Sequence, residues 1–143
     1  MRYFILFLFI LFSTSGFSQT DTEFWFVAPE VASLNGDQPI LLRFTTYHEA
    51  SSITITQPAN ASFKPIHIDV PALSTRTVDL TAFKDVIENK PSNQTNPYGI
   101  FIKATKPITS YYEVSNQTNN EIFVLKGKNA LGNQFYIPAQ NAF

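Results

Sequence analysis

Apolar and polar side chains alternate with a period of two through most of the chain after residue 39. This period is typical of β-strands that bury one face, because successive side chains of a strand point to opposite sides of the sheet. The pattern predicts strands over residues 40–45, 52–56, 64–70, 74–80, 98–104, 108–114, 121–125 and 134–137.

Residues 81–88 depart from this alternation. Phe83, Val86 and Ile87 recur at the i, i+3, i+4 spacing of a helix face, and Thr81 is a suitable N-cap. The segment therefore predicts one short helix packed on the sheet. Short strands separated by turns rich in asparagine, glycine and proline predict an all-β fold. We expect an antiparallel β-sandwich of jelly-roll or Ig-like type, incomplete at its C-terminus.

The apolar members of the alternating segments are the predicted core. Truncating a buried phenylalanine to alanine typically costs about 3–5 kcal/mol, so the prediction can be tested residue by residue. The predicted core residues are Phe24, Phe26, Leu42, Phe44, Ile53, Ile55, Ile66, Ile68, Ile100, Ile102 and Phe123.

Residues 1–18 have a different pattern. Arg2 precedes an unbroken apolar run over residues 3–12, and small polar residues follow up to Ser18. This order is that of a secretory signal peptide, and the apolar run is shorter than the roughly 20 residues of a membrane span. We expect cleavage after Ser18 and a mature β-sandwich domain over residues 19–143 that begins at Gln19. The mature chain is then secreted or on the outer cell surface, with no transmembrane segment.

The amino-acid composition argues against several classes of function. The 143 residues have a formal net charge of −1, which argues against a basic nucleic-acid-binding protein. The absence of cysteine excludes a disulfide framework, a thiolate metal site and a cysteine nucleophile. His48 falls in a predicted turn and His67 on the polar face of a predicted strand, and the acidic residues are scattered singly. We therefore expect no catalytic residue, no cofactor and no metal site.

Aromatic residues make up 15% of the chain, and most of them should be core. Trp25 lies between Phe24 and Phe26 and therefore points to the opposite strand face, and Tyr111 is separated from Tyr112 in the same way. Exposure of Trp25, Tyr47 or Tyr111 would favour a sugar-binding or protein-binding patch.

The segment 126–132 carries the densest basic spot of the chain, Lys126 and Lys128, together with two glycines. Glycine permits a positive φ and close backbone approach, so the segment predicts an exposed hairpin loop between strands 121–125 and 134–137. We expect Leu131 to fold back over apolar surface. The lysines either keep a solvated turn soluble or join Trp25 and Tyr111 in a recognition surface for an acidic glycan or a partner protein.

Several segments together resemble one family. They are residues 21–30, 39–43, 57–60 and 107–114, and above all the run from Phe123 to Gly132 with the Phe-Tyr-Ile-Pro of residues 135–138. These residues resemble the IgGFc-binding protein N-terminal domain at the head of large secreted surface proteins of Bacteroidetes, which are associated with gliding motility and type IX secretion. The resemblance implies an extracellular β-rich domain for adhesion or recognition and supplies no catalytic residues. It also implies a truncated chain, whose downstream domains are missing.

The leading hypothesis is a non-enzymatic extracellular or cell-surface adhesion and recognition module, the N-terminal part of a larger secreted protein, with a protein or glycan ligand. The alternative is a carbohydrate-binding β-sandwich module, and an enzyme ranks last. A row of exposed aromatic rings would favour sugar binding. A cleft with two carboxylates would favour an enzyme, and a flat polar face would favour an interaction module.

Overall fold

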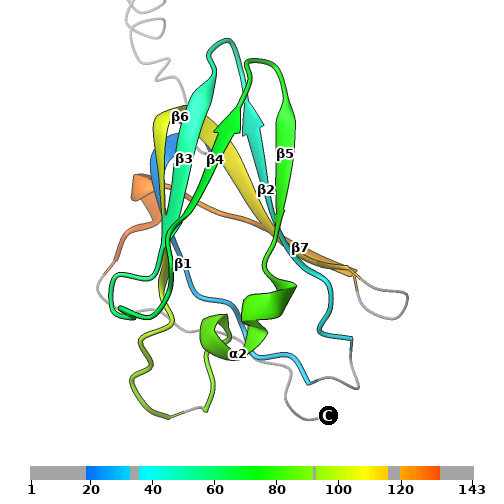
Figure 1. The fold of residues 1–143 in the computed structure, drawn as a ribbon, viewed down its shortest axis with the longest axis vertical. Coiled ribbons are helices and arrows are strands. Elements are labelled where there is room, and N and C mark those ends of the chain that lie inside the picture. The colour runs from blue at the N-terminus through cyan, green and yellow to red at the C-terminus, as the bar shows by residue number, and fades with distance from the viewer. Residues whose placement is uncertain (1–18, 33–35, 92, 116–119, 133–143) are drawn as a thin grey trace, which may run out of the picture.

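The structure, a computed structural model, describes residues 19–32, 36–91, 93–115 and 120–132 (Figure 1). Within these residues the chain forms antiparallel strands and one short α-helix, which confirms the predicted all-β fold. The predicted signal peptide and the predicted strand 134–137 lie outside the described residues. The elements are β1 (Asp21–Phe26), β2 (Ile40–Thr46), β3 (Ser51–Thr56), β4 (Ile66–Val70), β5 (Thr75–Asp79), η2 (Thr81–Phe83), α2 (Lys84–Ile87), β6 (Ile100–Ser115), β7 (Asn120–Val124) and η3 (Lys128–Ala130).

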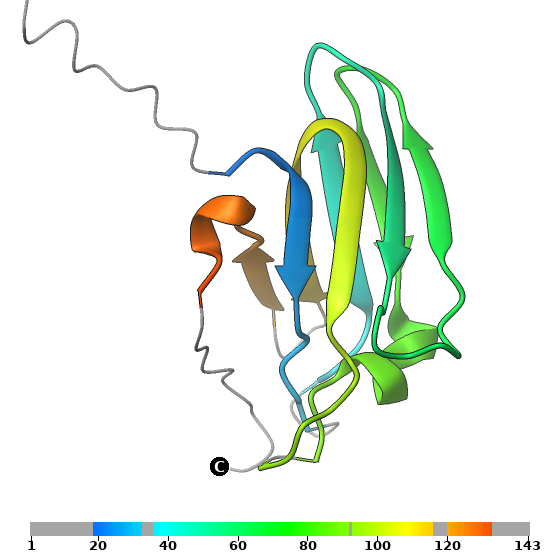
Figure 2. The same ribbon diagram turned by 90° about the vertical axis from the view of Figure 1, so that its left-hand side faces the viewer.

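The described strands form one seven-stranded sheet in the order β4-β3-β6-β2-β5. β3 and β2 pair with one edge of β6, and β1 and β7 pair with its opposite edge (Figure 2). The first half of β6 pairs with β1 and β3, and the second half pairs with β2 and β7. Figure 2 shows β6 arching from the part of the sheet that contains β1 and β3 to the part that contains β2. The sheet thereby folds over on itself and gives a sandwich-like architecture.

The prediction of two separate strands over 98–104 and 108–114 is wrong, because β6 runs through both as one strand of 16 residues. Residues 105–107 pair with no described strand, and β1 skips them by pairing Glu23 with Lys103 and Asp21 with Ile108. Such a bulge bends a strand and accepts a proline, whose missing N–H would otherwise cost a ladder bond. The polar and proline residues here bend the strand and do not end it.

The core lies between the two parts of the folded sheet. Seven predicted core residues are fully buried there: Phe24, Leu42, Phe44, Ile53, Ile55, Ile100 and Ile102. Phe26, Ile66 and Ile68 are partly buried against them. The prediction for Phe123 is wrong, because its side chain is 36% exposed. Its strand, β7, pairs only with the last residues of β6, where the Phe123 ring rests beside the Tyr112 ring at a centroid distance of 5.9 Å.

The predicted helix over residues 81–88 is present as η2 followed directly by α2. Thr81 is not its N-cap: Leu80 occupies that position, and the Thr81 hydroxyl instead accepts a hydrogen bond from the Ile40 N–H at 2.9 Å. This bond joins the start of the helix to β2. Ile87 is buried as predicted, but Val86 is 36% exposed, so the helix presents a narrower apolar face than its spacing suggested.

Candidate functional site

Trp25 and Phe101 form an aromatic pair on the outer face of the sheet. They are cross-strand neighbours on β1 and β6, with ring centroids 4.6 Å apart and an interplanar angle of 28°. Trp25 is 53% exposed even though its rings pack against Phe101. Stacking fixes the orientation of the indole, so it presents a rigid apolar surface to solvent. Trp25 thus lies on the strand face opposite the buried Phe24, as predicted, and meets the condition of exposure set for a binding patch.

The next outward positions along the same strands carry polar groups. Glu23 lies opposite Lys103, and Lys103 lies opposite Thr54 of β3. Lys128 Nζ approaches Glu23 Oε2 at 3.4 Å, which brings Lys128 to the strand face that carries Trp25. Thr54 Oγ1 in turn bonds His67 Nδ1 at 3.1 Å. The aromatic pair is therefore bordered by a row of hydrogen-bonding side chains, and His67 is the exposed strand residue that was predicted.

Gly127 positions Lys128 by packing closely on β1. A Cβ at Gly127 would lie 2.2 Å from Asp21 Cβ, and the Lys128 N–H donates to Asp21 Oδ2 at 2.8 Å. Burial acts to raise the pKa of Asp21, but backbone hydrogen bonds, with that of Lys128 foremost, hold it below its ordinary value. The glycine is needed here for close approach and not for a positive φ, since its φ is −69°.

The predicted 126–132 loop contains the short helical turn η3 beside β1, and both of its lysines are exposed. Its predicted partner strand 134–137 lies outside the described residues. Leu131 does not fold back over apolar surface: it is 62% exposed. Lys126 is exposed, and Leu125 just before it is buried, with its N–H bonded to the Ser110 carbonyl at 2.9 Å.

Tyr111 belongs to a different part of the sheet. It lies on the outward side of the second half of β6, between Val124 of β7 and Arg43 of β2. Arg43 forms a two-point ion pair with Glu113, which holds the pKa of that carboxylate below its ordinary value. The structure thus pairs Lys128 with Glu23, two residues before Trp25 on β1, whereas Tyr111 is on the other half of the bent strand and joins a separate group of side chains.

Sequence reasoning missed a buried acidic residue, Glu88, at the end of α2. Lys90 Nζ donates to its Oε2 at 3.0 Å, and the Val31 backbone N–H also bonds the carboxylate. Burial raises the pKa of Glu88, and Lys90 offsets only part of that effect. Glu88 also pairs with Ala28 in a parallel bridge. These contacts tie α2 to the segment that follows β1, so Glu88 holds two parts of the backbone together.

A second partly buried ion pair lies in the same region. Lys84 Nζ donates to Asp37 Oδ2 at 2.8 Å, and this bond raises the pKa of Lys84. Burial and the nearby charges of Glu88, Glu121 and Asp37 raise the pKa of Tyr112, whose hydroxyl is buried. The acidic residues of this region, Asp37 and Glu88, come singly from separate segments. Their proximity could therefore not be predicted from the sequence.

A shallow hollow of about 280 Å³ opens where β6 bends. Two of its lining residues, Glu49 and Lys106, form an ion pair of 2.6 Å, and the predicted turn residue His48 also lines it. The lining residues are Thr20, Tyr47, His48, Glu49, Lys106 and Pro107. Among the described residues, no group of three or more histidine, aspartate or glutamate side chains is placed to hold a metal ion.

The sequence matches no protein-family model and no curated protein. Among solved structures, the chain is similar to one described as "Crystal Structure of Thermotoga maritima 1070", with a TM-score of 0.43 and 16% sequence identity. The similarity covers 74% of this chain and 91% of that chain. At this distance it assigns neither a family nor a function. No helix in the described part of the chain is long and apolar enough to cross a membrane.

Proposed function

We propose that the protein is a non-enzymatic adhesion and recognition module of the cell exterior and the N-terminal part of a larger secreted protein. The observation that carries this proposal is the exposed Trp25–Phe101 pair beside Glu23, Lys103 and Lys128 on the outer face of the sheet. Tryptophan is enriched where one surface meets another, because it supplies a large rigid contact area and a polar N–H. The surrounding charges supply directional contacts to the same ligand.

A carbohydrate-binding module is the second candidate, and the stacked pair is also what favours it. The apolar C–H face of a sugar ring packs well on an indole whose orientation is fixed, as Phe101 fixes that of Trp25. Lysine ammonium groups and a glutamate carboxylate can then donate to and accept from the sugar hydroxyls. Lys103, opposite Glu23, and Lys128, which forms an ion pair with it, are the lysines that support this role.

The binding test compares Trp25→Ala with Tyr47→Ala, a matched aromatic truncation at an exposed position on another part of the surface. The ligands are arrayed glycans and immobilised cell-surface proteins from the organism that makes the chain. We expect Trp25→Ala to weaken binding at least about tenfold, the effect of losing one central aromatic contact, and Tyr47→Ala to leave it unchanged. Equal binding by the wild type and Trp25→Ala would show that Trp25 is not part of the binding site.

Export has its own test, which does not depend on the ligand. Mass spectrometry of the protein from the native organism should find a chain that begins at Gln19, outside the cytoplasm. Retention of Met1 on cytoplasmic protein would contradict the proposed localisation.

A further inference from the structure

The two ends of the sheet face each other without pairing. β4 pairs with β3 and β5 pairs with β2, and no described strand pairs with the free edge of either. Figure 1 shows β4 and β5 on the same side of the molecule with a gap between them. The turn that joins them is held at one end of the gap, where the Leu73 N–H donates to the Tyr47 carbonyl at 2.7 Å. The sheet is therefore open along one seam, which we define as the gap between β4 and β5.

The hydrogen bonds of β5 show which backbone groups face the seam. The Leu80 N–H donates to Ile40 and the Thr46 N–H donates to Ser74, so the even-numbered residues of β5 bond to β2. In an antiparallel ladder the alternate residues direct their N–H and C=O groups to the other side. The backbone groups of Thr75, Thr77 and Asp79 therefore point into the seam. An unpaired strand edge of this kind is a template for another strand.

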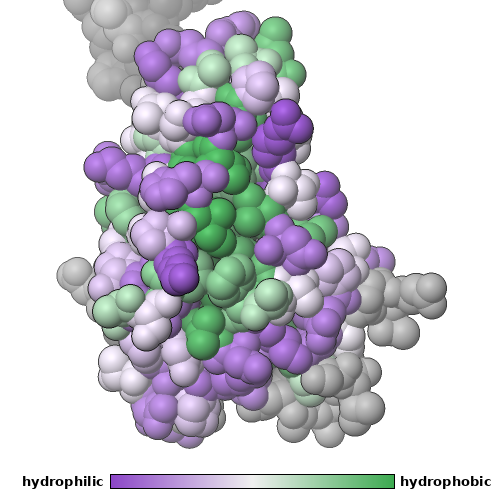
Figure 3. Space-filling model, viewed as in Figure 1, coloured by the Kyte–Doolittle hydropathy of each residue, from purple (hydrophilic) through white to green (hydrophobic). Residues whose placement is uncertain are grey.

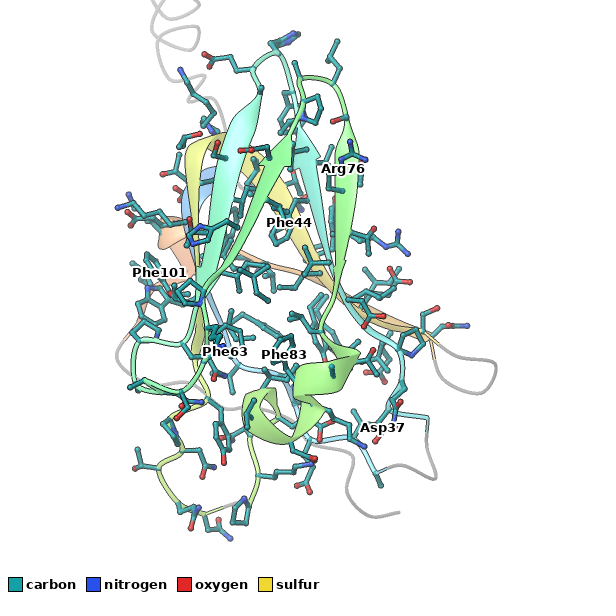
Figure 4. All side chains as sticks on the ribbon, viewed as in Figure 1. Asp37, Phe44, Phe63, Arg76, Phe83 and Phe101 are labelled. Carbon is teal, nitrogen blue, oxygen red and sulfur yellow. The ribbon has the colours of Figure 1, made fainter. Side chains whose placement is uncertain are left out.

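Apolar side chains line the floor of the seam. Ile66 and Ile68 of β4 and Val78 of β5 are partly buried against the core, and the fully buried Phe44 lies beneath them. Figure 3 shows a strip of hydrophobic residues between hydrophilic ones on this face, and Figure 4 shows Phe44 between the two strands. An extended segment lying in the seam would cover this strip with alternate side chains.

Arg76 is the charged residue among the inward positions of β4 and β5. The other inward positions are the apolar Ile66, Ile68, Val70 and Val78, whereas Arg76 is exposed, and Figure 4 shows its side chain beside β5, the strand that borders the seam. The structure records no ion pair between Arg76 and any described residue. An acidic group on an incoming strand would complement this charge.

We propose that the seam is an acceptor site for an extended strand of another protein, one with apolar side chains at alternate positions and an acidic side chain opposite Arg76. The incoming strand would hydrogen-bond to the free edge of β5 and close the sheet, the mode of recognition known as strand addition. This inference goes beyond the proposed recognition function, because it uses a surface that contains neither Trp25 nor the lysines around it.

The test uses the full chain and a labelled nine-residue peptide that alternates valine with threonine and has one aspartate in place of a central valine. Two control peptides carry lysine in place of the aspartate, or methylated amide nitrogens at alternate residues. Fluorescence anisotropy gives the affinities. We expect the aspartate peptide to bind about fivefold more tightly than the lysine peptide, the effect of one exposed ion pair, and Arg76→Glu to reverse this preference. The methylated peptide should not bind.

Thr77→Pro supplies an independent measurement, because it removes an N–H that faces the seam and leaves the bonds to β2 in place. Circular dichroism establishes that this variant is folded, and it should then bind the aspartate peptide several-fold more weakly. Equal binding of all three peptides, or none by any, would overturn the proposal.

Two further outcomes would also overturn it. Concentration-dependent dimers of the wild type in analytical ultracentrifugation, lost in Thr77→Pro, would assign the seam to a second copy of the chain. In the second outcome, Arg76→Ala self-associates and the wild type binds no peptide. Arg76 would then serve only to prevent β5 from pairing with another strand.

Discussion

β1 and β7 lie along the same edge of β6, yet they are packed very differently. β1 buries Phe24 completely in the core, whereas β7 leaves Phe123 partly exposed and Ile122 64% exposed. Each strand contains a phenylalanine that was predicted from the sequence to lie in the core. The two strands occupy different places along β6: β1 pairs with the half that has β3 as its other neighbour, and β7 pairs with the final residues, which have β2 as their other neighbour.

The comparison shows what alternation can and cannot predict. Alternation tells which side chains of a strand share a face, because that follows from strand geometry alone. Whether the face is buried depends on the elements packed against it, which are distant in sequence. Phe24 and Phe123 therefore look alike in the sequence and differ in the folded protein.

The largest expected effect separates the two strands directly. Phe24→Ala should lower the free energy of unfolding by about 3–5 kcal/mol, because it leaves a cavity in the core. Phe123→Ala should lower it by only about 1 kcal/mol, the centre of the range for single substitutions, because the Phe123 side chain is partly exposed. Denaturant unfolding measures both. Equal costs would mean that β7 is packed as firmly as β1.

A smaller effect is expected where η3 contacts β1. Gly127→Ala should destabilise the protein by about 1–3 kcal/mol, because the added Cβ would collide with the base of the Asp21 side chain. Gly99→Ala is the matched control: a Cβ at Gly99 meets nothing within 4 Å, so it should be neutral or slightly stabilising. If both variants melt like the wild type, the contact between η3 and β1 is not formed in solution.

Much of the fold could be predicted from the sequence, for physical reasons that particular residues illustrate. The period of two located β2, β3, β4 and β5 because each has one face in the core. It failed at Pro107, since a bulge that bends a strand and a turn that ends it use the same residue types. Of the candidate site, the exposure of Trp25 followed from its neighbours in β1. Its pairing with Phe101 could not be predicted, because register is set by the whole sheet.

A pH dependence should also arise at the contact between η3 and β1. The pKa of Asp21 is lowered from 3.8 in the folded protein, so the unfolded chain binds a proton more readily. The stability that Asp21 contributes is therefore present above the unfolded pKa and is lost as the pH falls through the folded pKa. Between about pH 5 and pH 2 the wild type should lose more stability than Asp21→Asn, which has no carboxyl group to titrate there. Parallel stability curves for the two proteins would rule out this contribution.

The smallest expected effect concerns the basic residues beside β7. The double variant Lys126→Glu/Lys128→Glu should change the free energy of unfolding by no more than about 0.5 kcal/mol, because both side chains are exposed. Thermal unfolding measures this change, and binding to cell-surface ligands at low ionic strength measures the role of the charges. A large loss of stability would show that the ion pair of Lys128 with Glu23 holds η3 in place.

The central position of β6 also governs how the chain can fold. β1, β2 and β3 are synthesised before β6, the strand with which each of them pairs. Pairings between segments so far apart in the sequence form slowly, because chain entropy is lost before the contacts are gained. Until β6 is complete, the nascent chain carries several open strand edges, which favour aggregation. The nascent chain is therefore most prone to aggregation in the interval between the synthesis of β3 and that of β6.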